Sequence, residues 1–216
     1  MSQPNPEITG STRIVTVSRQ LGAGGAAVAT RLADLLGWRL LDRALVEKIA
    51  EELKVAPEQV EPHDERVESF VERLGQYLSE GYPEILPIPM LPPVSPDRTA
   101  RAARRIVTAA LDESPAVIVG HGAQCVLRDD PRAFHVLLFA PLEVRIQRAT
   151  VRYGVDEETA AERIRESDAN RRAYIREHFD REWLDPRVYH LSIDTGRVAM
   201  EKAAELIELA IREGLG

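Results

Sequence analysis

Residues 13–36 read RIVTVSRQLGAGGAAVATRLADLL, and this stretch decides the fold. Residues 13–17 form a short, β-branched run that is typical of a strand. Three glycines lie within residues 18–25, and apolar side chains then recur at helical spacing over residues 26–36, up to Gly37. The pattern predicts a strand, a glycine-rich turn and a helix in direct succession.

The same alternation continues along the chain. Short apolar runs at 38–41, 116–119, 134–139 and 189–193 predict further strands. Helical patterns lie at 43–54, 58–80, 97–113, 156–178 and 199–212, and another helix begins at Pro141. Continuous apolar strands that alternate with helices indicate an α/β fold with a parallel sheet covered on both faces. Such sheets bind ligands at the carboxyl ends of their strands, here residues 18–25, 42–43 and 120–122 and the loop after Phe139.

The composition limits the class of protein. We expect the 216 residues to form a single domain with a proline-rich insertion at about 82–97, because six of the 14 prolines lie there. The net charge of -7 argues against a nucleic-acid polymer as partner. One cysteine, Cys125, excludes a disulfide scaffold, and the five histidines show no metal-ligand spacing. Because no long apolar run or signal segment occurs, we expect a cytoplasmic protein that does not enter a membrane.

The glycine-rich turn favours anion binding. Glycines allow successive backbone N–H groups to face a common centre, and the start of a helix adds partial positive charge. A tight connection that needs glycine only for its dihedral angles is the alternative. The P-loop consensus, Gly-x4-Gly-Lys-Ser/Thr, can be aligned with Gly24 as its second glycine. Arg19 then stands in place of the first glycine, Gly25 in place of the lysine, and Ala26 in place of the hydroxyl that holds magnesium.

Five segments together resemble the cytidylate kinase-like family of P-loop nucleoside monophosphate kinase folds. They are VSRQLGAGGAAVATRLADLLGWRLLDRALV (17–46), VIVGHGAQCVLRDDP (117–131), FHVLLFAPLEVRIQRA (134–149), DANRRAY (168–174) and WLDPRVYHLSIDT (183–195). The order and spacing of the segments carry the resemblance. It implies a three-layer P-loop kinase-like fold with a parallel sheet and a helical lid at about residues 153–180. Its members commonly lack the lysine too, whereas Ala26 and Ala27 replace their usual Arg-Glu pair.

The resemblance also implies an acceptor site. Asp42 and Arg43 follow the second predicted strand, and Arg104 lies on the helix at 97–113, where related kinases hold the acceptor nucleotide. Gly120 and His121 stand at the family's Gly-Arg-Gly position, so they are expected to face the acceptor as well. A surface ion pair, a solvated helix face and a turn histidine without chemistry are the respective alternatives.

In the lid, the resemblance points to arginines. Asp168 and Arg171 match an Asp-x-x-Arg motif, and closure of a lid brings such arginines onto a transferring phosphoryl group. Arg171 and Arg172, followed by Arg19, are therefore the candidates to supply the charge of the missing lysine. A plain charged helix held by Arg–Glu pairs is the alternative. Trp183 is expected to pack at the base of the lid.

The expected activity is transfer of the γ-phosphoryl group of ATP to a nucleoside monophosphate, by resemblance CMP or dCMP. Mg²⁺ is expected to be held mainly through the nucleotide, with no metal-ligating residue in the chain. The residues expected to bind the nucleotide are Ser18, Arg19, Gln20, Gly22, Ala23, Gly24 and Gly25. Two alternatives stay open: a nucleotide-binding module without turnover, such as a sensor or a partner subunit, and a kinase of another small metabolite. The expected partners are small nucleotides, and a homo-oligomer stays open.

Overall fold

The computed structural model of the protein describes residues 12–41, 114–120 and 122–214. The elements in this part are β1 Ile14–Arg19, α1 Gly25–Leu36, β2 Arg39–Leu41, β3 Ala116–Val119, α5 Ala123–Val126, β4 Ala133–Phe139, α6 Leu142–Tyr153, α7 Glu157–Phe179, the 3-10 turn η1 Pro186–Val188, β5 Leu191–Asp194 and α8 Met200–Arg212. The helices predicted at 43–54, 58–80 and 97–113 and the insertion at 82–97 lie outside the described residues.

The sheet has the order β2-β3-β1-β4-β5, and every described pair of neighbouring strands is parallel. The prediction of a parallel α/β sheet is thereby confirmed. The central strand, β1, places Val15 between Val117 of β3 and Phe134 of β4. It ends two residues later than predicted, because Ser18 and Arg19 remain paired with β4, and it begins one residue later, at Ile14. The strand thus carries these two side chains up to the edge of the glycine turn.

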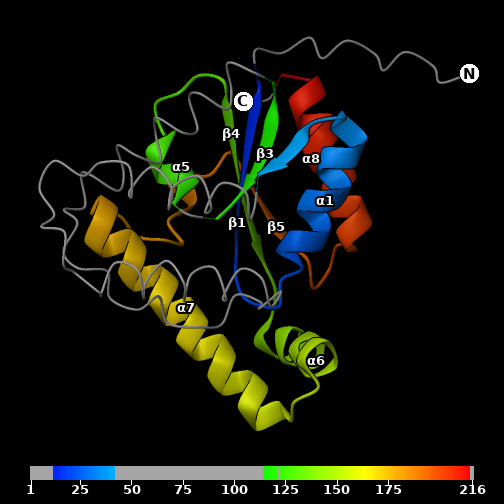
Figure 1. The fold of residues 1–216 in the computed structure, drawn as a ribbon, viewed down its shortest axis with the longest axis vertical. Coiled ribbons are helices and arrows are strands. Elements are labelled where there is room, and N and C mark those ends of the chain that lie inside the picture. The colour runs from blue at the N-terminus through cyan, green and yellow to red at the C-terminus, as the bar shows by residue number, and fades with distance from the viewer. Residues whose placement is uncertain (1–11, 42–113, 121, 215–216) are drawn as a thin grey trace, which may run out of the picture.

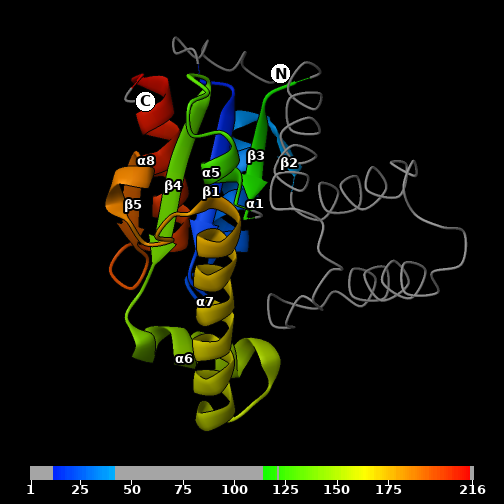
Figure 2. The same ribbon diagram turned by 90° about the vertical axis from the view of Figure 1, so that its left-hand side faces the viewer.

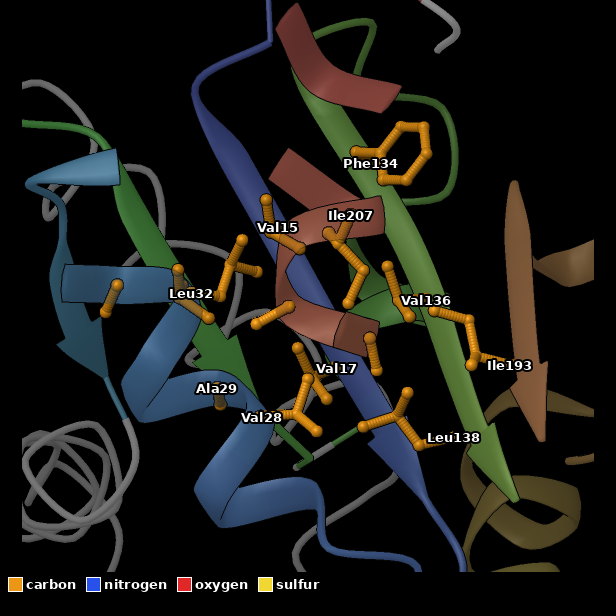
Figure 3. Close-up of a cluster of buried hydrophobic side chains, with 14 of the residues drawn as sticks. Val15, Val17, Val28, Ala29, Leu32, Phe134, Val136, Leu138, Ile193 and Ile207 are labelled. Atoms are coloured by element: carbon orange, nitrogen blue, oxygen red, sulfur yellow. The ribbon is translucent and has the colours of Figure 1, made fainter. Parts of the chain in front are cut away.

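Helices α1 and α8 cover one face of the sheet, and α5 lies on the opposite face (Figure 1). Figure 3 shows the main core between the sheet and helices α1 and α8, where Val17, Val28, Leu32 and Ile207 meet. These four side chains are inaccessible to solvent, and burial of each contributes roughly 1.5–3 kcal/mol. This packing fixes α1, and therefore the turn that precedes it, against the sheet.

Helices α6 and α7 lie beyond the carboxyl ends of β1 and β4 (Figures 1 and 2). Although α7 is mostly polar, its buried residues form one stripe that includes Ala160, Ile164 and Ile175. Ala160 and Ile164 of this stripe pack on Leu21 of the glycine turn, which is completely buried. Asp156 begins the helix, because its side chain accepts a hydrogen bond from the Thr159 amide at 2.7 Å.

Two local predictions differ from the structure. The last strand is Leu191–Asp194 rather than residues 189–193, because Pro186–Val188 forms a 3-10 turn immediately before it. The short helix α5 was not predicted, since a four-residue helix is too short to show a period. No helix in the described part of the chain has the length and apolar character needed to span a membrane.

Candidate functional site

The glycine turn leaves several backbone N–H groups without an internal acceptor. Gly22 and Gly24 adopt left-handed dihedral angles, with φ of 80° and 77°. The Ala23 amide donates to the Gln20 carbonyl at 3.1 Å. By contrast, no residue in the described part of the chain accepts a hydrogen bond from the amides of Gly24, Gly25 and Ala26, where α1 begins. These donors lie at the positive end of the helix dipole.

Arg19 extends across this turn. A Cβ atom built on Gly25 would lie 2.5 Å from Cγ of Arg19, and one built on Gly120 would collide with its Nη1. The side chain therefore passes over the start of α1 and reaches the carboxyl end of β3. Gly120 is fixed there because its amide donates to the Val17 carbonyl at 3.0 Å. A permanently charged guanidinium group thus lies between two of the strand ends at which ligands of parallel sheets bind.

Asp168 ties α7 to the turn. Its Oδ1 accepts a hydrogen bond from the Leu21 amide at 3.1 Å, and its Oδ2 pairs with Nη1 of Arg145 at 2.6 Å. Arg145, which is buried, also donates to the carbonyls of Ala140 and Leu21, at 3.0 Å and 3.4 Å. The carboxylate is therefore already used to hold the backbone of the turn and to neutralise a buried arginine.

A second arginine braces the other side of the turn. Arg148 donates to the Thr195 carbonyl at 2.8 Å and to the Gly22 carbonyl at 3.4 Å. Buried Thr195 in turn donates from Oγ1 to the Ala23 carbonyl at 2.9 Å. Neither this brace nor Arg145 was predicted from the sequence. The sequence did contain a signal for them. Arg145 and Arg148 are three residues apart, and so on one face of the helix that directly follows β4.

Ser18 takes part in a buried network rather than facing the turn alone. Its Oγ accepts a hydrogen bond from Nε1 of Trp183 at 2.9 Å and donates its own proton to the hydroxyl oxygen of Tyr189 at 3.3 Å. The tyrosine hydroxyl donates its proton to the Trp183 carbonyl at 2.6 Å. Burial raises the pKa of Tyr189 to about 12, so the phenol remains a donor at neutral pH. The packing predicted for Trp183 is confirmed, with a hydrogen bond in addition.

Arg171 lies between these two anchored groups. Its guanidinium carbon is 5.8 Å from the centre of the Trp183 ring, within the range of a cation–π contact. Its Nη1 is 3.6 Å from Oδ1 of Asp168. Trp183 is fixed by Ser18 and Asp168 by the Leu21 amide, so these two partners of Arg171 are anchored to the segment that leads from β1 into the turn.

The structure brings most of the predicted nucleotide-binding residues together. Ser18 and Arg19 complete β1, Gln20 follows it directly, the glycines and Ala23 form the turn, and Gly120 adjoins Arg19. The Oε1 atom of Gln20 accepts a 3.4 Å hydrogen bond from the amide of Ala140. Arg172 is exposed on α7, one position beyond Arg171. The candidates that lie outside the described residues, and so remain predictions, are Asp42, Arg43, Arg104 and His121.

Comparisons with known proteins identify the family of the chain. Residues 14–197 match the sequence pattern of the cytidylate kinase-like family. The chain is 27% identical over 199 residues to a cytidylate kinase of Methanopyrus kandleri, covering 92% of each sequence. It also resembles the crystal structure of an uncharacterised protein from Eubacterium ventriosum, with a TM-score of 0.65 and 23% identity over 93% of this chain and 98% of that one. Since the family pattern spans most of the sequence, the chain belongs to the cytidylate kinase-like family.

Proposed function

We propose that the protein transfers the γ-phosphoryl group of ATP to a nucleoside monophosphate, CMP or dCMP. The observation that carries the proposal is the glycine turn, whose unshared amides lie beside the side chain of Arg19. Arg171 is held near the same turn by Trp183 and by Asp168, which binds the Leu21 amide. Backbone donors and fixed guanidinium groups are what a polyphosphate requires. Membership of the family and the similarity to a cytidylate kinase support the choice of acceptor.

Phosphoryl transfer requires little covalent chemistry from the protein. Charge spreads over the oxygens of the transferred group, so positioning and charge stabilisation do most of the work. We assign phosphate binding to the amides of Gly22, Gly24 and Gly25. Arg19, Arg171 and Arg172 would offset the developing charge, each through a guanidinium group that can donate to phosphate oxygens. Asp168 then acts through the turn and the arginines rather than on the substrate, because its oxygens are already engaged.

Mg²⁺ fits this site only as a companion of the nucleotide. At position 26 the chain has a methyl group instead of a hydroxyl ligand, and the nearby carboxylate of Asp168 is neutralised by Arg145. The described part of the chain contains no group of three or more His, Cys, Asp or Glu residues that could hold a metal. When bound with ATP, Mg²⁺ supplies charge neutralisation across the phosphates.

The acceptor side of the proposed site begins at Gly120. Gly120 lies at the carboxyl end of β3, next to β1, and so close to the proposed phosphate site. We propose that His121 and the polar residues Asp42, Arg43 and Arg104 orient the acceptor from this side. Their roles rest on the family resemblance.

The test is a panel of nucleoside monophosphates with ATP and Mg²⁺, followed by the release of ADP. We expect turnover with CMP or dCMP. Arg171→Ala should lower kcat strongly with the fold intact, whereas Arg165→Ala, an exposed arginine on the same helix, should not. Tight binding of ATP without ADP release across the panel would instead favour a nucleotide-binding module without turnover, which the residues at positions 25 and 26 also suit. Release of ADP with other phosphate acceptors alone would favour a kinase of another metabolite.

A further inference from the structure

Gly25 has no conformational reason to be glycine. It is the first residue of α1 and does not lie in the left-handed region, unlike Gly22 and Gly24. Glycine is a poorer helix former than alanine, so a side chain would be favoured here on local grounds. The reason for glycine must therefore come from a neighbour in space.

That neighbour is Arg19. A Cβ atom at position 25 would lie 2.5 Å from Cγ and 2.8 Å from Cβ of Arg19, distances that real Cβ atoms do not adopt. At Gly120 a Cβ atom would collide with Nη1 of the same side chain. Two glycines thus clear a path for one arginine, from the end of β1 across the first turn of α1 to the end of β3.

The positions of these residues in the P-loop consensus give the arrangement a chemical meaning. With Gly24 aligned to the second glycine of the motif, Arg19 occupies the position of the first glycine and Gly25 that of the lysine. The glycine and the cation have exchanged places. In the folded chain, however, the arginine stem lies directly over the residue from which the lysine would have extended.

We propose that Arg19 replaces the missing P-loop lysine in space, and that its guanidinium contacts the phosphates of the nucleotide bound at the glycine turn. The proposal rests on the proposed function, whose nucleotide it uses. Arginine suits the task, because its fork offers several donors to phosphate oxygens and keeps its charge. The packing of the stem over Gly25 holds the side chain in place before the ligand arrives, which reduces the entropy lost on binding.

The test compares charge with packing at position 19. Arg19→Met keeps an unbranched stem over Gly25 and removes the charge, and Arg19→Lys keeps a charge. Arg13→Met, at the amino end of the same strand, is the matched control because that arginine is exposed and remote from the turn. Binding of ATP and of inorganic triphosphate is measured by calorimetry, and folding is checked by circular dichroism. We expect Arg19→Met to weaken both ligands about 10- to 100-fold, as for loss of one charge-assisted contact, and Arg19→Lys to weaken them less.

The decisive variant restores the consensus. Gly25→Lys alone should be harmful, since the new side chain meets Arg19, whereas Arg19→Gly combined with Gly25→Lys should bind ATP at least about tenfold more tightly than Arg19→Gly. A folded double variant that binds no better than Arg19→Gly overturns the proposal. If the double variant does not fold, the Arg19→Met result decides alone, and an affinity within threefold of the unaltered protein overturns it.

Failure of the proposed function would be recognised separately. An unaltered protein that binds ATP but never releases ADP refutes phosphoryl transfer, while the affinity series still decides the role of Arg19. A protein that binds neither ATP nor inorganic triphosphate refutes both.

Discussion

Replacement of Asp168 by Asn tests the link between α7 and the glycine turn. The change leaves an oxygen for the Leu21 amide but removes the charge that neutralises Arg145 at 2.6 Å. The two side chains are only 12% and 9% exposed, so the arginine would remain charged and buried. Loss of one partner of a buried ion pair costs about 3–5 kcal/mol. We expect a value of about 3 kcal/mol, because Arg145 keeps its hydrogen bonds to two carbonyls.

Urea unfolding followed by circular dichroism measures this loss as a change in the free energy of unfolding. Glu205→Gln is the control, since its partner Lys202 lies on the exposed side of α8 and such pairs contribute at most about 1 kcal/mol. Adding Arg145→Leu to Asp168→Asn removes the stranded charge, so the double variant should be no less stable than Asp168→Asn. Additive losses in the double variant, or a loss from Asp168→Asn below about 1 kcal/mol, would refute the idea that this pair anchors the turn.

Three further predictions concern the site and the sheet. Trp183→Phe should reduce turnover in the unaltered protein but cause no additional reduction in the Arg171→Ala variant, because the Trp183 ring acts by holding that arginine. Equal reductions in both backgrounds would contradict this role of Trp183. Burial lowers the pKa of His135 from 6.5 to about 4, so the imidazole resists protonation in the folded state. The free energy of unfolding should therefore be fully retained above pH 6.5 and decline by up to about 3 kcal/mol as the pH falls to 4. Urea titrations at each pH should show a smaller decline for His135→Gln than for the unaltered protein. Gly22→Ala should destabilise the protein more than Gly37→Ala does. Both glycines have positive φ, but only at Gly22 would the added methyl group meet another residue, the Arg145 carbonyl oxygen at 2.8 Å. Equal melting temperatures of the two variants would argue against crowding at Gly22.

The sequence alone was sufficient for most of the described elements, though not for the short helix α5, and for the class of fold. Continuous apolar runs such as residues 116–119 can only be buried on both faces of a sheet, and the interleaved helices make the strands parallel. The glycine turn was predictable because a strand and a helical period meet there within a few residues. The pairing of Asp168 with Arg171 was within reach as well, since residues three apart share a helix face.

The tertiary structure decided which polar groups remain available for a ligand. Asp168 and Arg171 look alike as members of one motif, yet the carboxylate is taken up by a backbone amide 147 positions away. Ser18 precedes the turn in sequence, but its hydroxyl serves a tryptophan 165 positions later. The reason is physical: periodicity reports which side of its own element a residue faces, whereas the partner of a buried charge or hydroxyl depends on how distant elements pack. Only the folded chain brings Arg19 over Gly25, and the proposed role of Arg19 in place of the lysine depends on that packing.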